Sequence, residues 1–204
     1  MASSPLTPDA FQALTGVSRE TLGRFETYAA LIVKWQKAIN LVGPKTLADI
    51  WRRHFLDSAQ LWSLIPAGAQ TLVDLGSGAG LPGMVLALLD FPEVHLIESD
   101  QRKAVFLRES ARELGLKVTV HAKRAEVVTG VDADVVTARA LAPLEDLVGL
   151  AAPFWRVRGG CGLFLKGAES SRELTGVQKR QNMRVDRFPS LTEPRGSVLR
   201  LREI

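Results

Sequence analysis

The sequence predicts an α/β fold in which a mostly parallel sheet carries helices on both faces and follows a helical extension. Three observations lead to this prediction. Residues 71–75 form a short apolar run that is typical of a buried parallel strand. A glycine-rich stretch follows directly and contains Gly76, Gly78, Gly80 and Gly83. Residues 69–204 alternate strand-like with helix-like segments, whereas residues 1–68 have only helical patterns.

The helical extension, residues 1–68, is expected to contain three helices. A Thr-Pro-Asp start at 7–9 predicts a short first helix. Ser18 can cap a second helix, whose apolar residues recur at intervals of three or four as far as Ile39. Thr46 can cap a third helix, which would run to about Ile65.

The α/β region, residues 69–204, is expected to contain five strands joined by helices. The strands are predicted at Thr71–Leu75, Val94–Glu98, Lys117–His121, Asp134–Ala138 and Gly162–Lys166. The helices are predicted at 83–90, 101–114, 124–128 and 142–156. Two weaker strand candidates, Arg184–Phe188 and Ser197–Leu201, flank a turn at 194–196. This last pair would extend the sheet to seven strands.

Composition limits the class of protein. At 204 residues, with 46% hydrophobic and 24% charged residues, the chain is ordinary globular material and not disordered. The excess of Lys plus Arg over Asp plus Glu, 26 − 22 = 4, permits an anionic partner such as RNA without requiring one. The lone Cys161 excludes an internal disulfide and fits a reducing compartment. Without a signal peptide or an apolar span, we expect a cytoplasmic protein that makes no membrane contact. No apolar stripe in the sequence calls for a dimer, so we expect a monomer.

The glycine-rich stretch predicts a nucleoside cofactor, because backbone N–H groups at a helix start can approach a ligand closely there. Two cofactors are compatible with it. The segment 78–83 fits the dinucleotide pattern G-x-G-x-x-G, which is weak evidence alone. In the other frame, Asp74 precedes Gly76 by two residues and resembles the first motif of class I S-adenosylmethionine (SAM) methyltransferases. That frame favours SAM, since Gly76 directly follows the strand; Glu98 could bind the ribose of either cofactor.

Further candidates follow the next strands, since ligands of open α/β sheets bind beyond the carboxyl ends of the strands. Ala125 and Glu126 could contact an adenine ring, or could simply begin a helix. Arg139 and Lys166 could bind a phosphate, a carboxylate or a nucleobase. The alternative for both is a solvated strand end.

Polar groups cluster on the third predicted helix. Arg53 and Asp57, like His54 and Ser58, are four residues apart and share one side of it. A Ser-His-Asp triad is excluded because Ser58 does not follow a strained strand-to-helix turn. A metal site lacks a third ligand, so none is expected. Two alternatives stay open: an internal ion-pair cluster, or an element that faces RNA or the cofactor.

Taken together, the chain resembles the RsmG (glucose-inhibited division protein B, GidB) family of methyltransferases. The matching segments are Trp35-x4-Asn40-Leu41, Arg53-His54-x2-Asp57-Ser58, Asp74–Gly83, Glu98-Ser99, Phe106-Leu107, Ala138-Arg139-Ala140 and Leu165-Lys166-Gly167. Val42 and Leu81 replace the usual Thr and Phe. The resemblance implies the class I SAM-dependent methyltransferase fold, Rossmann-like with a mostly parallel seven-stranded sheet. It also implies SAM-dependent methylation of N7 of a guanine in 16S (small-subunit) ribosomal RNA, offered as RNA or as the small ribosomal subunit.

The resemblance and the glycine frame together give the expected site. The cofactor residues are Asp74, Gly76, Ser77, Gly78, Gly80, Leu81, Glu98, Ala125, Glu126 and Arg139. The residues that face RNA are Asn40, Arg53, His54 and Asp57. Arg139 and Lys166 would place the guanine, and no general base is needed because N7 carries a free lone pair.

Other classes of function remain as alternatives. They are a methyltransferase for a protein or small molecule, a nicotinamide-dependent oxidoreductase and a non-enzymatic RNA-binding protein. A basic tail would suit RNA and contains Arg172, Lys179, Arg180, Arg184 and Arg187.

Overall fold

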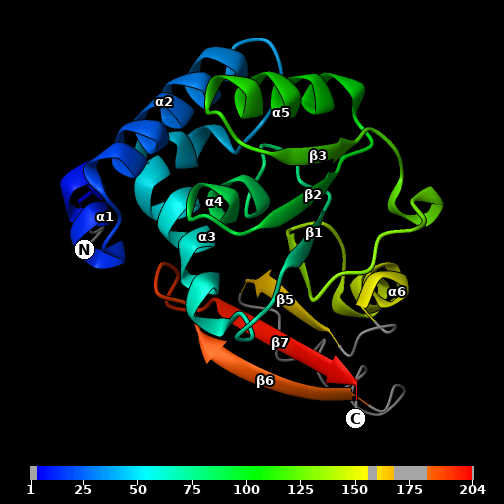
Figure 1. The fold of residues 1–204 in the computed structure, drawn as a ribbon. Coiled ribbons are helices and arrows are strands. Elements are labelled where there is room, and N and C mark those ends of the chain that lie inside the picture. Colours follow the sequence, from blue (N-terminus) through cyan, green and yellow to red (C-terminus); the bar gives the residue numbers. More distant parts are fainter. Residues whose placement is uncertain (1–3, 156–159, 168–182, 204) are drawn as a thin grey trace.

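The computed structural model describes residues 4–155, 160–167 and 183–203 and contains a seven-stranded sheet in the order β3-β2-β1-β4-β5-β7-β6 (Figure 1). The strands are β1 Thr71–Leu75, β2 Glu93–Ile97, β3 Val118–His121, β4 Val135–Arg139, β5 Cys161–Lys166, β6 Met183–Pro189 and β7 Ser197–Glu203. The first five are parallel, whereas β7 runs antiparallel to both β5 and β6. The predicted α/β sheet is therefore confirmed, including its two C-terminal strands.

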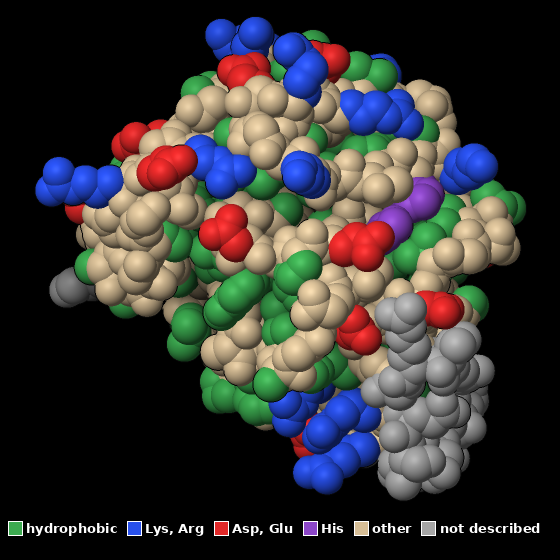
Figure 2. Space-filling view, viewed as in Figure 1, with side chains coloured by type: hydrophobic (Ala, Val, Ile, Leu, Met, Phe, Trp, Pro, Cys, Tyr) green, Lys and Arg blue, Asp and Glu red, His purple; other side chains and the backbone are tan. Residues whose placement is uncertain are grey.

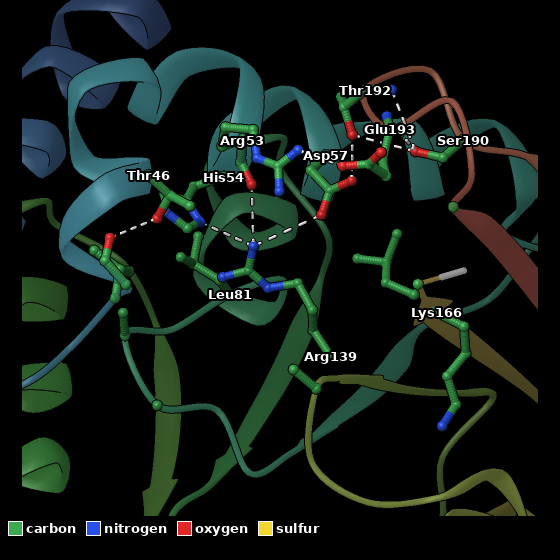
Figure 3. A pocket seen from close by; sticks show the side chains of 18 of the residues that line it. Thr46, Arg53, His54, Asp57, Leu81, Arg139, Lys166, Ser190, Thr192 and Glu193 are labelled. Carbon is green, nitrogen blue, oxygen red and sulfur yellow. Dashed lines mark hydrogen bonds and ion pairs between the residues drawn. The ribbon is translucent and has the colours of Figure 1, made fainter. Parts of the chain in front are cut away.

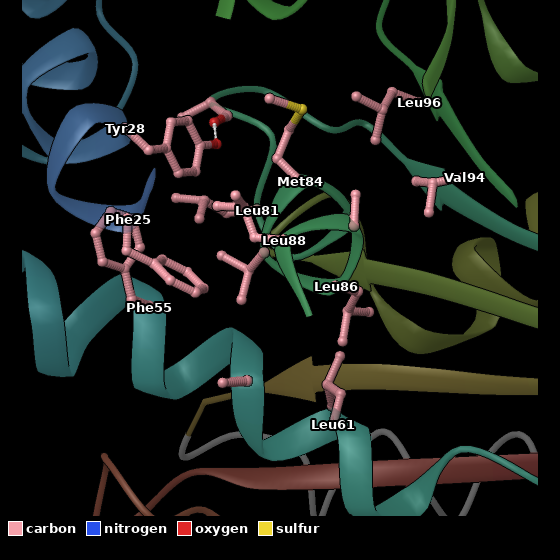
Figure 4. Packing of buried hydrophobic residues seen from close by; sticks show 14 of the residues in the cluster. Phe25, Tyr28, Phe55, Leu61, Leu81, Met84, Leu86, Leu88, Val94 and Leu96 are labelled. Carbon is pink, nitrogen blue, oxygen red and sulfur yellow. Dashed lines mark hydrogen bonds between the residues drawn. The ribbon is translucent and has the colours of Figure 1, made fainter. Parts of the chain in front are cut away.

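Helices cover both faces of the sheet because neighbouring strand residues point to opposite sides. On one side, Leu72 of β1 joins a cluster with the N-terminal helices and with α4 and α5. Figure 4 shows the part of this cluster between the N-terminal helices, α4 and β2. On the other side, Val73 packs in a cluster with α6. The helices are α1 Pro8–Thr15, α2 Arg19–Gln36, α4 Gly83–Leu88, α5 Gln101–Glu113 and α6 Leu144–Trp155. The helical extension thus shares a hydrophobic core with the sheet.

The first two helices begin as predicted but the second ends early. Thr7 and Ser18 are the N-cap residues, and their hydroxyl oxygens accept hydrogen bonds from backbone N–H groups three residues later. Helix α2 ends at Gln36 and not near Ile39. The Gln36 carboxamide oxygen accepts from the backbone N–H groups of Leu41 and Val42, at 2.9 and 3.0 Å, and so stabilises a turn in place of further helix.

The third predicted helix ends close to where it was expected, but it begins earlier, at Pro44, and not after a Thr46 cap. It is also not one continuous α-helix. It consists of a 3-10 segment η1 Pro44–Asp49, a π segment η2 Trp51–Leu56, the short α3 Asp57–Ala59 and a second 3-10 segment η3 Gln60–Leu64. The Thr46 hydroxyl donates to the Gly43 carbonyl at 2.7 Å instead of capping. Such changes of helical winding are frequent at functional sites.

The remaining differences are small. The expected helix 124–128 is only the 3-10 turn η4 Ala125–Val127. The turn residue Gly159 and the basic residues Arg172, Lys179 and Arg180 lie outside the described residues. On the face in Figure 2, Lys and Arg side chains gather over β6, the strand that carries Arg184 and Arg187 of the predicted basic tail. Of the described helices, none has the length and apolar character needed to span a bilayer.

Candidate functional site

A cavity of about 650 Å³ opens at the carboxyl ends of β1, β4 and β5. This is the edge at which open α/β sheets bind ligands, and the volume is in the range of small-molecule sites. Its walls come from residues 41–46, the third helix, the loop after β1, the ends of β4 and β5, and the β6–β7 loop (Figure 3). The predicted site residues in its lining are Arg53, His54, Asp57, Gly76, Ser77, Gly78, Leu81, Arg139 and Lys166.

The glycine loop, residues 76–80, has the geometry of the Asp74 frame. Gly76, Gly78 and Gly80 have φ values of 62°, 56° and 81°, in the left-handed region that side chains disfavour. Gly83 has no such φ and starts α4. A β-carbon on Gly78 would meet only the Gly76 carbonyl, at 3.8 Å, so open space remains above this backbone. A ligand can therefore approach the loop closely at Gly78.

Asp74 supports this loop from beneath and does not line the cavity. Its side chain is fully buried and accepts hydrogen bonds from the Thr137 hydroxyl at 2.7 Å and from the Gly83 N–H at 3.2 Å. Burial raises the pKa of the Asp74 carboxyl to about 6. Asp74 therefore supports the glycine loop, and its expected contact with the cofactor stays a prediction. Gly80 is also buried, against Tyr28, whose hydroxyl donates to the Ala79 carbonyl.

Glu98 borders the glycine loop from β2. One carboxylate oxygen accepts from the Gly78 N–H at 2.8 Å, and the other accepts from the Asp100 N–H at 2.8 Å. Ala125 and Glu126 lie after β3, one strand further along the same edge, and Glu126 is exposed. None of these three predicted residues is in the cavity lining, and only Glu98 has a hydrogen bond to the loop.

Arg139 connects the sheet to the helical extension. It alternates along β4 with Ala138, so its side chain points to the same face as Thr137 and Asp74. Its Nη1 donates to the His54 Nδ1 at 2.9 Å and to the Arg53 carbonyl at 3.2 Å, and lies 3.6 Å from an Asp57 oxygen (Figure 3). These contacts hold the guanidinium at one wall of the cavity.

His54 is neutral in this arrangement. A guanidinium can only donate, so Nδ1 of His54 accepts from Arg139 and Nε2 carries the proton. The Nε2–H group donates to the Thr46 hydroxyl at 2.8 Å. Burial, and then Arg139 and Arg53, lower the pKa of His54 to about 3. Both ring nitrogens are therefore engaged in contacts within the protein, while His54 also lines the cavity.

Lys166 and Arg139 both line the cavity, but their side chains leave the sheet on opposite faces. Residues of β5 alternate between the two faces: Leu165 packs on the side of the helical extension and Phe164 on the side of α6. Lys166 leaves on the α6 side, and its Nζ donates to the Ala142 carbonyl at 2.8 Å. Figure 3 shows its side chain pointing away from Arg139. Asn40, unlike Lys166, lies outside the lining, and its neighbours Leu41–Gly43 line the cavity instead.

The β6–β7 loop, residues 190–196, is a wall that the sequence interpretation missed. The Thr192 hydroxyl donates to Asp57 at 2.5 Å, and the Glu193 carboxylate lies 2.6 Å from Arg53. The turn at 194–196 was predicted, but its place was not. The antiparallel return of β7 beside β5 brings the loop to the cavity.

The sheet order, the antiparallel β7 and the glycine loop at the end of β1 define a class I SAM-dependent methyltransferase. Solved structures share the fold: magnesium protoporphyrin IX methyltransferase from Synechocystis with bound SAM has a TM-score of 0.63 at 13% identity, covering 92% of this chain and 98% of that one. The 16S rRNA methylase RmtB has a TM-score of 0.60 at 14% identity, covering 96% and 81%.

More specifically, the chain belongs to the rRNA small subunit methyltransferase G (GidB) family, whose model matches residues 21–197. It is 59% identical to the ribosomal RNA small subunit methyltransferase G of Rhodospirillum centenum, over 95% of this chain and 89% of that protein. It is 57% identical to that of Paramagnetospirillum magneticum, over 97% and 96%. The predicted family and fold are confirmed.

The residues present fit SAM. The open space above Gly78 admits a ligand against the backbone, and the Glu98 carboxylate lies beside it with lone pairs left for ribose hydroxyls. Leu81 adds an apolar contact in the lining. Among the described residues, no group of His, Cys, Asp and Glu side chains could hold a metal ion.

Proposed function

We propose that this protein transfers a methyl group from SAM to N7 of a guanine in small-subunit ribosomal RNA. The observation that carries the proposal is the family match over residues 21–197, together with a glycine loop that opens into the cavity. The class of enzyme, an rRNA methyltransferase that uses SAM, follows from membership of the family.

The cofactor side of the cavity is the glycine loop. SAM supplies a methyl group that is already activated on a sulfonium. The backbone of Gly76–Gly78 would hold its amino-acid end, with Leu81 beside it, and Glu98 would hold the ribose. We assign the adenine to Ala125 and Glu126, which follow the neighbouring strand.

Positioning, not proton transfer, is the task of the residues around the guanine. N7 carries a lone pair and no proton, so no general base is required. His54 would be a poor base in any case, since both nitrogens are engaged and its pKa is lowered to about 3. Arg139 is held through Nη1, and we assign its other nitrogens to the guanine O6 edge or to a phosphate, because N7 must stay free. Lys166 would contact the RNA from the other side of β5.

The substrate side is assigned to the helical extension. Arg53 and Asp57 line the cavity, and Asn40 lies beside lining residues at its rim. Residues 69–204 would then contribute the cofactor side of the site, and residues 1–68 would contribute the RNA side together with Arg139 and Lys166. The proposal includes a monomer that acts in the cytoplasm on the RNA or on the assembled small subunit.

The experiment is transfer of tritiated methyl from SAM to unmodified ribosomal RNA, offered naked and as small subunits. Protein, DNA and small metabolites serve as parallel acceptors. We expect label only in RNA, released by cleavage chemistry specific for 7-methylguanine. Label in protein or metabolite, with SAM bound but no RNA labelled, would replace the proposal by the alternative acceptor. Absence of SAM binding would overturn the cofactor assignment.

A further inference from the structure

The β6–β7 loop is a preorganised wall of the cavity. Within it, the Ser190 N–H donates to the Gly196 carbonyl at 3.1 Å and the Gly196 N–H donates to the Glu193 carbonyl at 2.8 Å. It is also fastened to the third helix, because the Leu191 N–H donates to the Gln60 side chain at 2.9 Å. Hydrogen bonds within the loop and to another element fix its backbone before any ligand arrives.

Glu193 is the side chain that this wall presents with acceptor capacity. The Arg53 guanidinium, 2.6 Å from one carboxylate oxygen, holds the pKa of Glu193 below its usual range. The carboxylate is therefore ionised and can only accept hydrogen bonds. Its side chain is 40% exposed, and the contact with Arg53 is made through Oε2, so lone pairs remain for further donors.

The second carboxylate of the lining, Asp57, already contacts three side chains of the protein. Its Oδ1 accepts from the Gln60 carboxamide at 3.0 Å and from the Thr192 hydroxyl at 2.5 Å. Its Oδ2 faces Arg139 at 3.6 Å. Of the two acidic side chains that line the cavity within the described residues, Glu193 is thus the more exposed, at 40% against 17% for Asp57, and has more acceptor capacity left.

The chemistry of guanine matches this acceptor. Guanine presents two adjacent donors, N1–H and N2–H2, on its Watson–Crick edge, and enzymes that act on an unstacked base read that edge by hydrogen bonds. An ionised carboxylate offers two acceptor oxygens at a matching separation. It also favours the positive charge that the purine gains when N7 is methylated. Adenine, cytosine and uracil lack this pair of neighbouring donors.

We propose that Glu193, oriented by Arg53, accepts hydrogen bonds from N1–H and N2–H2 of the target guanine and selects guanine as the substrate base. The proposal rests on the proposed function and deepens it. Arg53 is a positioning residue in this scheme, since it acts on the base only through Glu193. The loop that carries Glu193 belongs to β6 and β7, so cofactor binding at the glycine loop does not depend on it.

The test is a cycle of one protein change and one substrate change. The protein change is Glu193→Gln, which can still accept from Arg53 but turns an NH2 group toward the base. The substrate change replaces the target guanosine of the unmodified RNA by inosine, which lacks the N2 amino group. With wild type, we expect inosine to lower kcat/KM about 10–100-fold, the usual effect of losing a hydrogen bond to a charged group. With Glu193→Gln, kcat/KM for the guanine-containing RNA should fall by a similar factor. In that variant, replacing the guanine by inosine should lower kcat/KM by no more than about a further 3-fold.

Equal inosine penalties in wild type and Glu193→Gln would overturn the proposal, because a residue that only shapes the loop would affect both substrates alike. Glu109→Gln is the matched control: it also loses a carboxylate paired with an arginine, Arg112 at 2.9 Å, on the exposed face of α5. It should behave as wild type. The SAM dissociation constant should be unchanged in every variant.

Two further readouts keep the outcomes distinct. If wild type labels no guanine RNA, the proposed function fails first; if wild type is active and the penalties are equal, only the role of Glu193 fails. If Glu193→Gln melts well below wild type, Glu193→Asp runs the same cycle with the charge retained. In Glu193→Asp, kcat/KM should still be higher for RNA with guanine than for RNA with inosine at the target position. A guanine-to-inosine ratio of kcat/KM equal to that of a Glu193→Ala variant would contradict the assignment.

Discussion

The glycine loop allows packing to be separated from ligand approach by two single substitutions. Gly78 and Gly80 both have left-handed backbones, so an alanine at either costs about 1–2 kcal/mol of strain. Their surroundings differ. At Gly80 a β-carbon would lie 2.4 Å from the Met84 side chain and 2.6 Å from the Tyr28 hydroxyl, both buried, whereas at Gly78 it would enter open space.

From these contacts we expect Gly80→Ala to lose stability and Gly78→Ala to lose ligand affinity. Overpacking adds about 1–3 kcal/mol at Gly80, so its unfolding free energy should fall by about 2–5 kcal/mol. For a chain of this size that corresponds to a fall in Tm of roughly 4–20 °C. Gly78→Ala should lose only the strain of about 1–2 kcal/mol, but should bind SAM at least about tenfold more weakly, since its methyl group fills the space left for the ligand.

Urea unfolding gives the stabilities, and equilibrium dialysis with labelled SAM gives the affinities. Gly115→Ala is a suitable control, because its backbone is also left-handed and its β-carbon would meet nothing within 4 Å. It should lose stability like Gly78→Ala and bind SAM like wild type. The reasoning is refuted if Gly80→Ala is no less stable than Gly115→Ala, or if Gly78→Ala binds SAM normally.

Three further predictions concern Tyr28, His54 and the methyl-transfer step. Tyr28→Phe leaves the buried Ala79 carbonyl without its hydroxyl donor and should lower the unfolding free energy by about 1–3 kcal/mol, measured in urea; no change would mean that the bond is not formed. Burial, and then Arg139 and Arg53, lower the pKa of His54 from 6.5 to about 3, so the native state binds fewer protons than the unfolded state and stability falls as pH drops from about 6.5 toward about 3. His54→Gln should reduce that fall, and identical pH dependence of denaturation in both proteins would contradict it. The methyl-transfer step, followed in single turnovers, should vary by less than about 3-fold from about pH 7 to about pH 9, above the pKa of about 6 for Asp74; a steep bell would show that a proton is transferred.

The parts of the fold set by local physics could be predicted from the sequence. A strand buried on both faces reads as an apolar run, and left-handed backbone positions require glycine, so β1 and the loop after it were placed correctly. The position of Asp74 next to the motif was also correct. The hydrogen bonds of its carboxylate to the Thr137 hydroxyl and the Gly83 N–H could not be predicted, because they depend on how α4 packs on the sheet.

The parts set by distant contacts could not be predicted. The winding of residues 44–64 depends on side chains such as Thr46 and His54, which bond to partners that helix periodicity does not specify. Arg139 and Lys166 are each the last residue of their strands, β4 and β5, but their side chains leave the sheet on opposite faces. Glu193 had no motif at all, and its partner Arg53 is 140 positions away in the sequence. The predicted assignments of ligand contacts to individual residues remain proposals.

The pairing of Arg53 with Glu193 also sets an order of events during synthesis. Translation at about 5–20 residues per second separates the emergence of these two residues by roughly 7–30 seconds. In that interval the strands β1 to β5 and the glycine loop are already available to fold, while β7 has yet to insert beside β5. The glycine loop and the strand ends beside it are therefore synthesised before the loop that carries Glu193. The β6–β7 hairpin is thus the last part of the cavity wall to be synthesised, and Glu193 is placed beside Arg53 once β7 has paired with β5.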